Sequence, residues 1–243
     1  MKKFGYLIPL AIIMASCGKE NTFSNDFGSA AFINVSMGSP GLEILEDTTK
    51  KHAGSIGVGT WTNYLGFVPG SKVTNVRRAD NLSNVASTTL SYNVGQANTI
   101  LIYDTLVVGA GGALSGTLRT ARLTDDLTFP EAGRTKVRFV HTAQNAPAVD
   151  VTLLRTSVTP NDSVTVTNRS YIGSTPSDAV LTASSTFASL PAGTYSVKIK
   201  LAGTQTLARA AQSFALVNGG VYTLLAVGTA RGVALQAISI RNL

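Results

Sequence analysis

The stretch that decides the fold is K-V-R-F-V-H-T-A-Q-N-A-P-A-V-D-V, residues 136–151. It has a weaker twin in A-A-F-I-N-V-S-M-G-S-P-G-L-E-I, residues 30–44. Superposing the two pairs Phe139 with Phe32, His141 with Asn34, Pro147 with Pro40, and Asp150 with Glu43. Every pair is 107 residues apart without a gap, so the pattern predicts a chain built from two similar halves.

The spacing between the halves grows along the chain. It is 107 residues at the opening motif, 123 between Gly70 and Gly193, and 124 between Gly95 and Gly219. The second half therefore carries extra residues, and the polar segment 156–170 is the expected insertion. Loops on rigid sandwiches commonly carry function, so this segment is a candidate functional region.

The composition favours an all-β chain. It is 44% hydrophobic and only 14% charged, with 23 glycines, so it can bury a core. Tyr195, Val197 and Ile199 alternate with polar residues, which is the period of a half-buried strand. The apolar run 98–108 predicts a buried strand, and Trp61, Tyr64 and Phe67 are expected in a core aromatic cluster.

About seven short strands in roughly 100 residues are typical of an immunoglobulin-like sandwich. We therefore expect an all-β chain with two tandem immunoglobulin-like β-sandwich domains behind a lipoprotein signal peptide. A single lipocalin-like barrel is the alternative. Segments 136–142 and 148–154 are expected to pair as a hairpin, with Phe139 opposite Val151 on an apolar face. Arg138 and Asp150 then lie together on the solvated face, as a weak pair.

The N-terminus reads as a secretory leader. Lys2 and Lys3 precede an apolar run that is shorter than a transmembrane helix and contains Pro9. The run ends in Met14-Ala15-Ser16-Cys17, which resembles a bacterial lipobox. Cys17 is the only cysteine, so no intramolecular disulfide can form, and lipid attachment at Cys17 is the expected modification.

The resulting domain plan has five parts. They are a signal peptide (1–16), a lipidated tether (17–28), a first sandwich (29–128), a linker (129–135) and a second sandwich (136–243). The expected location is the outer membrane of a Gram-negative bacterium, held through the N-terminal lipid. Whether the protein faces the periplasm or the cell surface is left open.

The second half carries a family resemblance. D-D-L-T-F-P-E-A-G-R-T-K-V-R-F-V-H-T-A-Q-N-A-P-A-V-D-V (125–151) and L-P-A-G-T-Y-S-V-K-I (190–199) resemble domain-of-unknown-function family 4397. The resemblance is stronger over 134–243 than over 29–128, where Asn34 and Glu43 replace His141 and Asp150. It implies a β-sandwich outside the cytoplasm and brings no established activity.

Few residues suit catalysis. The histidines are His52 and His141, and the usual nucleotide, metalloprotease and hydrolase motifs are missing from the sequence. As a base or metal ligand, His141 would support a hydrolase with a shallow site. As a neutral imidazole bonded to turn backbone, it would only build the turn. The twin has Asn34 there, which cannot shuttle protons at neutral pH, so the second interpretation is favoured. Phe139, His141, Pro147 and Asp150 are then a structural motif.

Charged and polar residues outside this motif also allow a structural and a functional interpretation. Glu43, Glu46 and Asp47 precede Lys50 and Lys51, which suits a solvated loop better than a calcium or glycosidase site. The 65 residues after Asp178 have no acidic side chain and carry Lys198, Lys200, Arg209, Arg231 and Arg241. This basic end is most simply a set of solvated strand faces, and binding of acidic glycans or lipopolysaccharide phosphates is the alternative. Asp47-Thr48-Thr49 and Asp162-Ser163-Val164 resemble O-glycosylation motifs at Thr48 and Ser163.

The sequence therefore predicts a non-enzymatic envelope lipoprotein without a cofactor, metal or nucleic-acid partner. It would serve as a structural, adhesion or ligand-binding module, with an extracellular glycan or another envelope protein as partner. The alternatives are a carbohydrate-binding accessory of a glycan-uptake system and a hydrolase with its site near His141. The carbohydrate alternative requires exposed aromatic side chains.

Overall fold

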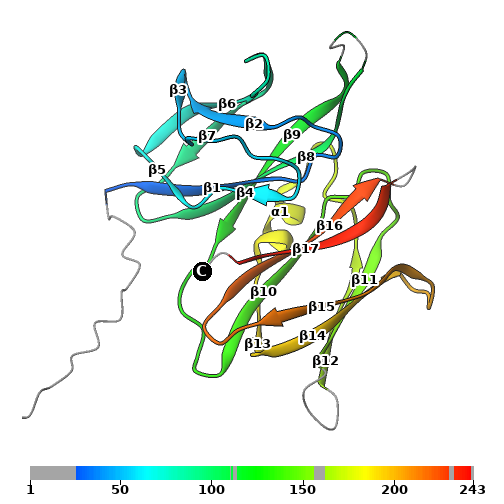
Figure 1. Ribbon diagram of the computed structural model, residues 1–243. Helices are drawn as coiled ribbons and strands as arrows, with labels where there is room; N and C mark the ends of the chain where they lie inside the picture. The colour runs from blue at the N-terminus through cyan, green and yellow to red at the C-terminus, as the bar shows by residue number, and fades with distance from the viewer. Residues whose placement is uncertain (1–25, 110, 112–113, 156–161, 230–232, 242–243) are drawn as a thin grey trace, which may run out of the picture.

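The computed structural model describes residues 26–109, 111, 114–155, 162–229 and 233–241 (Figure 1). Within these residues the regular structure is β-strand except for one short helix, α1 (Asp178–Ser185). The expected all-β class is confirmed. The signal peptide, Cys17 and the tether as far as residue 25 lie outside the described residues. No helix in the described part is long and apolar enough to cross a membrane.

The first unit, residues 28–125, has two sheets. Its strands are β1 (Gly28–Asn34), β2 (Leu42–Glu46), β3 (Thr49–Lys50), β4 (Thr60–Trp61), β5 (Leu65–Phe67), β6 (Gly70–Arg78), β7 (Asn84–Tyr92), β8 (Ala97–Val108) and β9 (Leu114–Asp125). The outer sheet has the order β3-β2-β6-β7. The inner sheet has the order β4-β1-β8-β9, and β5 also pairs with β1.

The second unit, residues 134–241, repeats this arrangement. Its strands are β10 (Arg134–His141), β11 (Val149–Arg155), β12 (Asp162–Arg169), β13 (Ala188–Pro191), β14 (Gly193–Leu201), β15 (Leu207–Leu216), β16 (Val221–Thr229) and β17 (Val233–Arg241). The inner sheet has the order β13-β10-β16-β17 and the outer sheet β12-β11-β14-β15.

Strand register follows the twin sequences. In the first unit β1 is parallel to β8, with Phe32 beside Ile100. In the second unit β10 is parallel to β16, with Phe139 beside Leu224. The two positions in each unit are related by the same spacings, 107 and 124 residues, that relate the halves of the sequence. The halves thus share both strand order and this register.

Three clusters of buried side chains make a stack of four layers. One cluster fills the space between the two sheets of the first unit, and a second does the same in the second unit. The third joins the outward faces of the two inner sheets, through residues such as Ile33, Leu101, Val140 and Leu225. Each inner sheet is therefore covered on both faces, which explains why 98–108 is a continuous apolar run rather than an alternating one.

The predicted hairpin of 136–142 with 148–154 is wrong. β10 pairs with β13 and β16, whereas β11 pairs with β12 and β14, so the two strands lie in different sheets. Phe139 and Val151 do share one apolar cluster, but they face each other across the sandwich. The apolar face was correctly predicted, because alternation fixes which side chains point inward and does not fix which strands pair.

The predicted solvent pair of Arg138 and Asp150 is also wrong. Arg138 is buried at the junction of the units, and its Nη1 lies 2.7 Å from Oδ1 of Asp125. Asp150 instead accepts backbone hydrogen bonds from Asn168 (2.7 Å) and Gly203 (2.9 Å). These bonds hold the pKa of the Asp150 carboxyl below its usual range.

Element boundaries and the aromatic cluster also differ from expectation. β1 includes Gly28, which was assigned to the tether, and β10 includes Arg134, which was assigned to the linker. Phe67 is buried and stacks on Tyr92 with ring centroids 4.1 Å apart. Trp61 is 41% exposed on β4, so its expected place in the core is wrong.

The extra residues of the second half lengthen the β11–β12 hairpin. β12 has eight residues, whereas the strand in the same place of the first unit, β3, has two. Residues 156–161 of the predicted insertion lie outside the described residues. The segment therefore forms an extra length of sheet edge in the second unit.

We expect Arg138→Leu to lower the free energy of unfolding by about 3–5 kcal/mol, because it leaves the Asp125 carboxylate buried without its cation. Urea denaturation measures the loss. Lys136→Ala is the matched control two residues away on β10, since Lys136 pairs with a largely exposed Asp126, and it should cost under about 1 kcal/mol. The double variant Arg138→Leu/Asp125→Leu should recover much of the loss. Equal costs for Arg138→Leu and Lys136→Ala would contradict the role of the ion pair.

Candidate functional site at the junction of the two units

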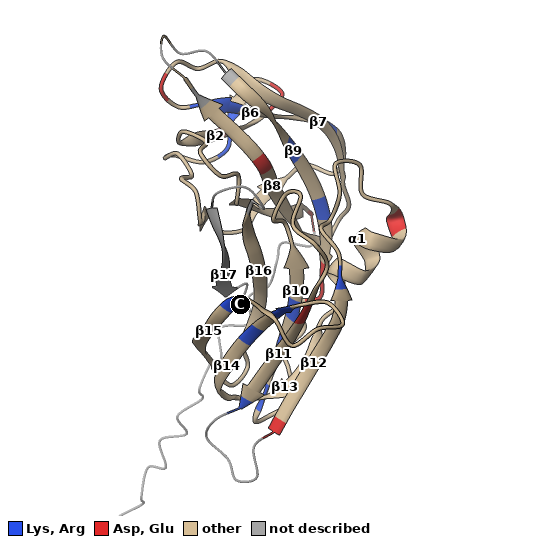
Figure 2. Ribbon diagram, turned by 90° about the vertical axis from the view of Figure 1, so that its right-hand side faces the viewer, with Lys and Arg blue, Asp and Glu red and all other residues tan. Residues whose placement is uncertain are grey.

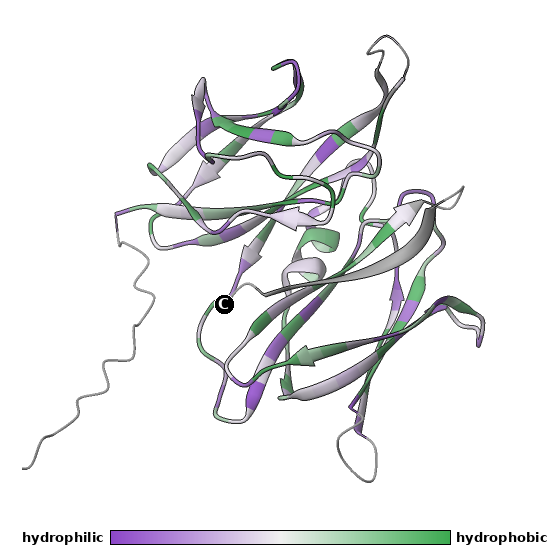
Figure 3. Ribbon diagram, viewed as in Figure 1, coloured by the Kyte–Doolittle hydropathy of each residue, from purple (hydrophilic) through white to green (hydrophobic). Residues whose placement is uncertain are grey.

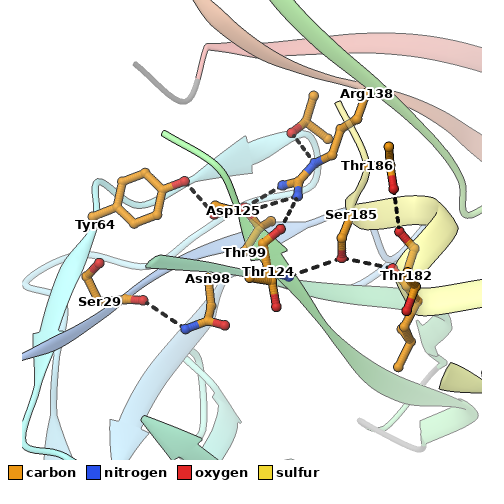
Figure 4. Close-up of polar contacts among 12 residues, drawn as sticks. Ser29, Tyr64, Asn98, Thr99, Thr124, Asp125, Arg138, Thr182, Ser185 and Thr186 are labelled. Carbon is orange, nitrogen blue, oxygen red and sulfur yellow. Dashed lines mark hydrogen bonds and ion pairs between the residues drawn. The ribbon is translucent and has the colours of Figure 1, made fainter. Parts of the chain in front are cut away.

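The junction is organised by the guanidinium of Arg138 (Figure 4). Its Nε donates to Oγ1 of Thr223 in the second unit at 2.9 Å. Its Nη2 donates to Oγ1 of Thr99 in the first unit at 2.8 Å. The ring of Phe187 lies 4.6 Å from the guanidinium carbon, which adds a cation–π contact. One side chain on β10 thus bonds to both inner sheets.

Asp125 completes this arrangement at the end of β9. Its Oδ2 accepts hydrogen bonds from the hydroxyls of Tyr64 (2.6 Å) and Thr99 (2.8 Å), while Oδ1 faces Arg138. Both charged side chains are fully buried. A buried charge is tolerated where its partners are in place, so these contacts fix how the units meet.

A second buried cluster joins the units on β8. The carboxylate of Asp104 accepts a hydrogen bond from the hydroxyl of Tyr171 and pairs with Nε of Arg119 at 2.6 Å. Burial, together with the Asp104 carboxylate, raises the pKa of the Tyr171 hydroxyl. The Tyr103 hydroxyl donates to the carbonyl of Gly173 at 3.0 Å. The segment that follows β12 is thereby bonded to the first unit.

Asp104 has an unusual backbone. Its φ of +71° lies in the left-handed region, which side chains other than glycine seldom adopt. The position 124 residues later is Gly228, with φ of +131°. The second unit uses glycine where the first uses an aspartate whose carboxylate holds Tyr171 and Arg119. The side-chain contacts offset the backbone strain.

His141 belongs to the turn between the two sheets of the second unit. Its Nδ1 accepts a hydrogen bond from the backbone N–H of Ala143 at 3.2 Å. The proton is then on Nε2, which donates to the carbonyl of Pro147 at 3.1 Å. Burial, offset in part by this bond, lowers the pKa of the imidazole. This is the backbone-bonded arrangement that the sequence favoured.

Asn34 makes the equivalent side-chain hydrogen bonds to the backbone in the first unit. Its Oδ1 accepts from the backbone N–H of Ser36 at 3.0 Å, two residues on, as in His141 and Ala143. Its Nδ2 donates to the carbonyl of Ile56 at 3.1 Å. The turns also share a left-handed residue at equivalent places, Gly38 with φ of +77° and Asn145 with φ of +58°. The motif builds the same turn in both units.

Of the acidic residues Glu43, Glu46 and Asp47, the two glutamates are paired with cations, and Asp47 is exposed on a turn. Glu43 contacts Lys50 and Arg77, and Glu46 contacts Lys51 at 3.0 Å. The hydrogen bonds from Lys50 and Arg77 lower the pKa of Glu43. Among the described residues, no group of three or more His, Cys, Asp and Glu side chains could hold a metal ion. The proposed modification sites Thr48 and Ser163 are both exposed, on a turn and on β12.

A hollow lies on the outer side of the junction, between α1 and β9. We call it the helix hollow, and it has a volume of about 330 Å³. Its lining residues are Arg122, Thr124, Asp178, Leu181, Thr182 and Ser185. In Figure 2, α1 stands at the right-hand edge of the molecule, beside β9 and β10. Sequence reasoning missed the hollow, because α1 is too short to give a clear helical period.

The frame of the helix hollow is firmly held. Ser177 caps the start of α1 by accepting from the backbone N–H of Val180. Val180 and Leu181 pack against the third cluster, and part of α1 has the green of hydrophobic residues in Figure 3. Ser185 bridges helix and strand, because its hydroxyl donates to Leu181 and accepts from the backbone N–H of Thr124 at 3.1 Å. Arg122 donates to the carbonyl of Ser91 at 2.7 Å.

The comparisons with known proteins identify a family and little more. A family model described as "Domain of unknown function (DUF4397)" matches residues 28–152. The match covers the first unit, β10 and part of β11, whereas the sequence analysis placed the stronger resemblance over 134–243. No protein with a curated description matches the chain.

Two solved structures show a weak likeness. One is a leucine-rich repeat protein from Bacteroides thetaiotaomicron, with 13% identity, a TM-score of 0.22 and coverage of 84% of this chain. The chain spans 26% of the length of that protein. The other is a family CBM26 module from Eubacterium rectale Amy13K in complex with maltoheptaose, with 10% identity, a TM-score of 0.24, and coverage of 88% of this chain and 97% of the module. Both TM-scores are low, and we draw no conclusion from either.

The geometry of His141 gives a prediction about pH. The unfolded imidazole has a pKa near 6.5, and the folded one titrates lower. The contribution of His141 to stability is therefore fully present above pH 6.5 and is lost as the pH falls toward the folded pKa, because the unfolded state then binds the proton first. We expect His141→Asn to fold, since Asn34 fits the same turn, and to flatten the decline of unfolding free energy with acidification. Urea denaturation from pH 8 to pH 5 tests this, and an unchanged pH profile would contradict it.

Proposed function

The chain belongs to the DUF4397 family of domains of unknown function, and we propose that it is a non-enzymatic, lipid-anchored protein of the bacterial envelope that binds a polar ligand in the helix hollow. The proposal has three parts, which are the architecture, the anchor and the ligand. Each has its own support.

For the architecture, we propose two tandem immunoglobulin-like sandwiches with the boundaries of the two units. The support is the repeated strand order, with β1 beside β8 and β10 beside β16 in matching register. In a single closed barrel one sheet would return on itself, whereas each unit here has two sheets with a cluster of its own.

For the ligand, the single observation that carries the proposal is the polar lining of the helix hollow. Arg122 offers hydrogen-bond donors, Asp178 offers acceptors, and the Thr182 hydroxyl offers both. The volume of about 330 Å³ is at the lower end of ligand sites, which suits one or two sugar rings or a ligand of similar size. The lining side chains stand on a helix and a strand that the buried junction holds in place, so the site is largely preformed.

The hydrogen bonding and burial of the His141 ring support a non-enzymatic role. Both ring nitrogens bond to backbone groups, and the ring is buried. A general base must reach the proton it removes, so this imidazole would first have to break the turn that it builds.

A second candidate is a carbohydrate-binding accessory of a glycan-uptake system with its site on exposed aromatic rings. The specific observation is Trp61, which is 41% exposed on the edge strand β4. Phe67 and Tyr195 are buried and cannot serve as platforms. Ligand loss on Trp61→Ala would favour this site over the helix hollow.

Binding to a glycan array, followed by calorimetry on the best ligand, tests the ligand proposal. The protein is used with Cys17→Ser so that it is soluble. Arg122→Ala and Asp178→Ala should each weaken binding about tenfold, because each removes a charged hydrogen-bonding group from the hollow. Lys198→Ala on β14 of the outer sheet is the control and should bind as well as the parent. Unchanged binding in both hollow variants would rule out the helix hollow.

The anchor gives a separate prediction. Replacing Cys17 by Ser removes the only thiol that could take a lipid, so the protein should move from the detergent-soluble membrane fraction to the soluble fraction. Fractionation with an antibody to the folded body measures this. Ser16→Thr, which keeps Cys17, is the control. Membrane retention of Cys17→Ser without detergent would show that the lipid is not the anchor.

A further inference from the structure

Three apolar side chains surround the point at which the anchoring segment enters the folded body. Phe27 precedes β1, Val68 lies in the turn between β5 and β6, and Val94 lies in the turn between β7 and β8, and all three are exposed. We call them the entry patch. We propose that the entry patch lies against the lipid bilayer, so that the first unit rests on the membrane by this end.

The three residues come together because of strand pairing. Gly28 pairs with Phe67, which places Phe27 beside Val68 across the edge of the sheet. The carbonyl of Phe27 accepts from the backbone N–H of Gly95 at 3.0 Å, which places Phe27 beside Val94. Three separate segments therefore present apolar side chains at one end of the first unit.

The length of the preceding chain indicates what covers the patch. Phe27 lies ten positions after Cys17, and a fully extended chain spans at most about 35 Å over ten positions. If Cys17 carries lipid, as the proposed function requires, the entry patch is always within that distance of the bilayer. Apolar contact with the membrane is then an intramolecular event, in which even weak interactions are effective.

Charge is compatible with this orientation. Lys72 stands near the start of β6, at the end of the first unit that holds the patch, and is half-buried. Its flexible stem can extend along apolar surface while the ammonium reaches a headgroup phosphate. A bilayer surface offers both the apolar layer and the phosphates.

The far end of the same unit supplies a matched control. β7 runs from the turn that contains Leu82 to the turn that contains Val94, a length of about 30 Å for its nine residues. Leu82 is 57% exposed and Val94 is 56% exposed. The two positions therefore differ in their distance from the anchor and hardly in their exposure.

Depth-dependent fluorescence quenching tests the inference on the full lipidated chain in phosphatidylglycerol and phosphatidylcholine vesicles. Because Cys17 is the only cysteine and its thiol carries the lipid, Val94→Cys and Leu82→Cys each provide one reactive thiol for a dye. Brominated acyl chains should quench the dye at position 94 about threefold more strongly than at position 82, since quenching requires the dye to enter the outer 5–10 Å of the bilayer.

The outcomes separate the orientation from the anchor. Stronger quenching at position 94, reduced by Phe27→Ser together with Val68→Ser, supports the inference. Weak quenching at both positions in protein that still floats with the vesicles overturns the orientation and leaves the lipid anchor intact. Equal strong quenching at both positions also overturns it, because the body then lies on its side. Failure to float, with the same result for Cys17→Ser, refutes the anchor and the inference together.

Discussion

The ion pair between Arg138 and Asp125 is the constraint on which the arrangement of the two units depends. The guanidinium has polar partners in both units, which are Thr223 in its own inner sheet and Thr99, Thr124 and Asp125 in the other unit. Moving one inner sheet past the other by a single residue would leave two charges buried without partners, which is costly in a protein interior. The apolar contacts of the third cluster favour association without direction, whereas the ion pair selects one register. Because Asp125 is the last residue of β9, the ion pair also fixes the point at which the chain leaves the first unit.

Much of the fold follows from the order of residue types. The alternation of Tyr195, Val197 and Ile199 marked a strand with one solvated face, and the run 98–108 marked one that is covered on both faces. The equivalent positions of His141 and Asn34 predicted a turn, because the two side chains differ in acid–base chemistry and share their ability to hydrogen-bond to backbone.

The alternation of residues could not reveal that Arg138 is buried. Its position in β10 predicts a solvated side chain, because the surface that covers it belongs to the other unit. Asp125 was equally hidden, since Asp125-Asp126 near the end of the first half, just before the linker, is typical of an exposed segment. The pairing of β10 failed because strands adjacent in sequence usually pair, and here the turn crosses from one sheet to the other.

The polar side chains of the junction divide into two groups with different uses. Arg138, Asp125 and Asp104 are themselves buried, and their hydrogen bonds and ion pairs hold the units together. Arg122 on β9 and Asp178 on α1 line the helix hollow. The first group gives the second a stable frame, because α1 is bonded to β9 through Ser185 and packed on the third cluster. Helix, strand and ion pair are thus connected parts of one junction, in which the first unit supplies β9 and Asp125 and the second unit supplies α1 and Arg138.

The double coverage of the inner sheets has a consequence for synthesis. The first unit leaves the ribosome before the second, and the outward face of β1, β8 and β9 has no cover until β10 and β16 exist. β16, the later of these two covering strands, ends at Thr229, about a hundred residues after the end of β9 at Asp125. Synthesis of that length takes roughly 5 to 20 seconds. During that interval the nascent chain exposes an apolar surface that includes Ile33, Leu101 and Tyr103. The nascent chain must therefore be protected from aggregation until its second unit is synthesised. A protein truncated after the first unit would expose this apolar surface permanently.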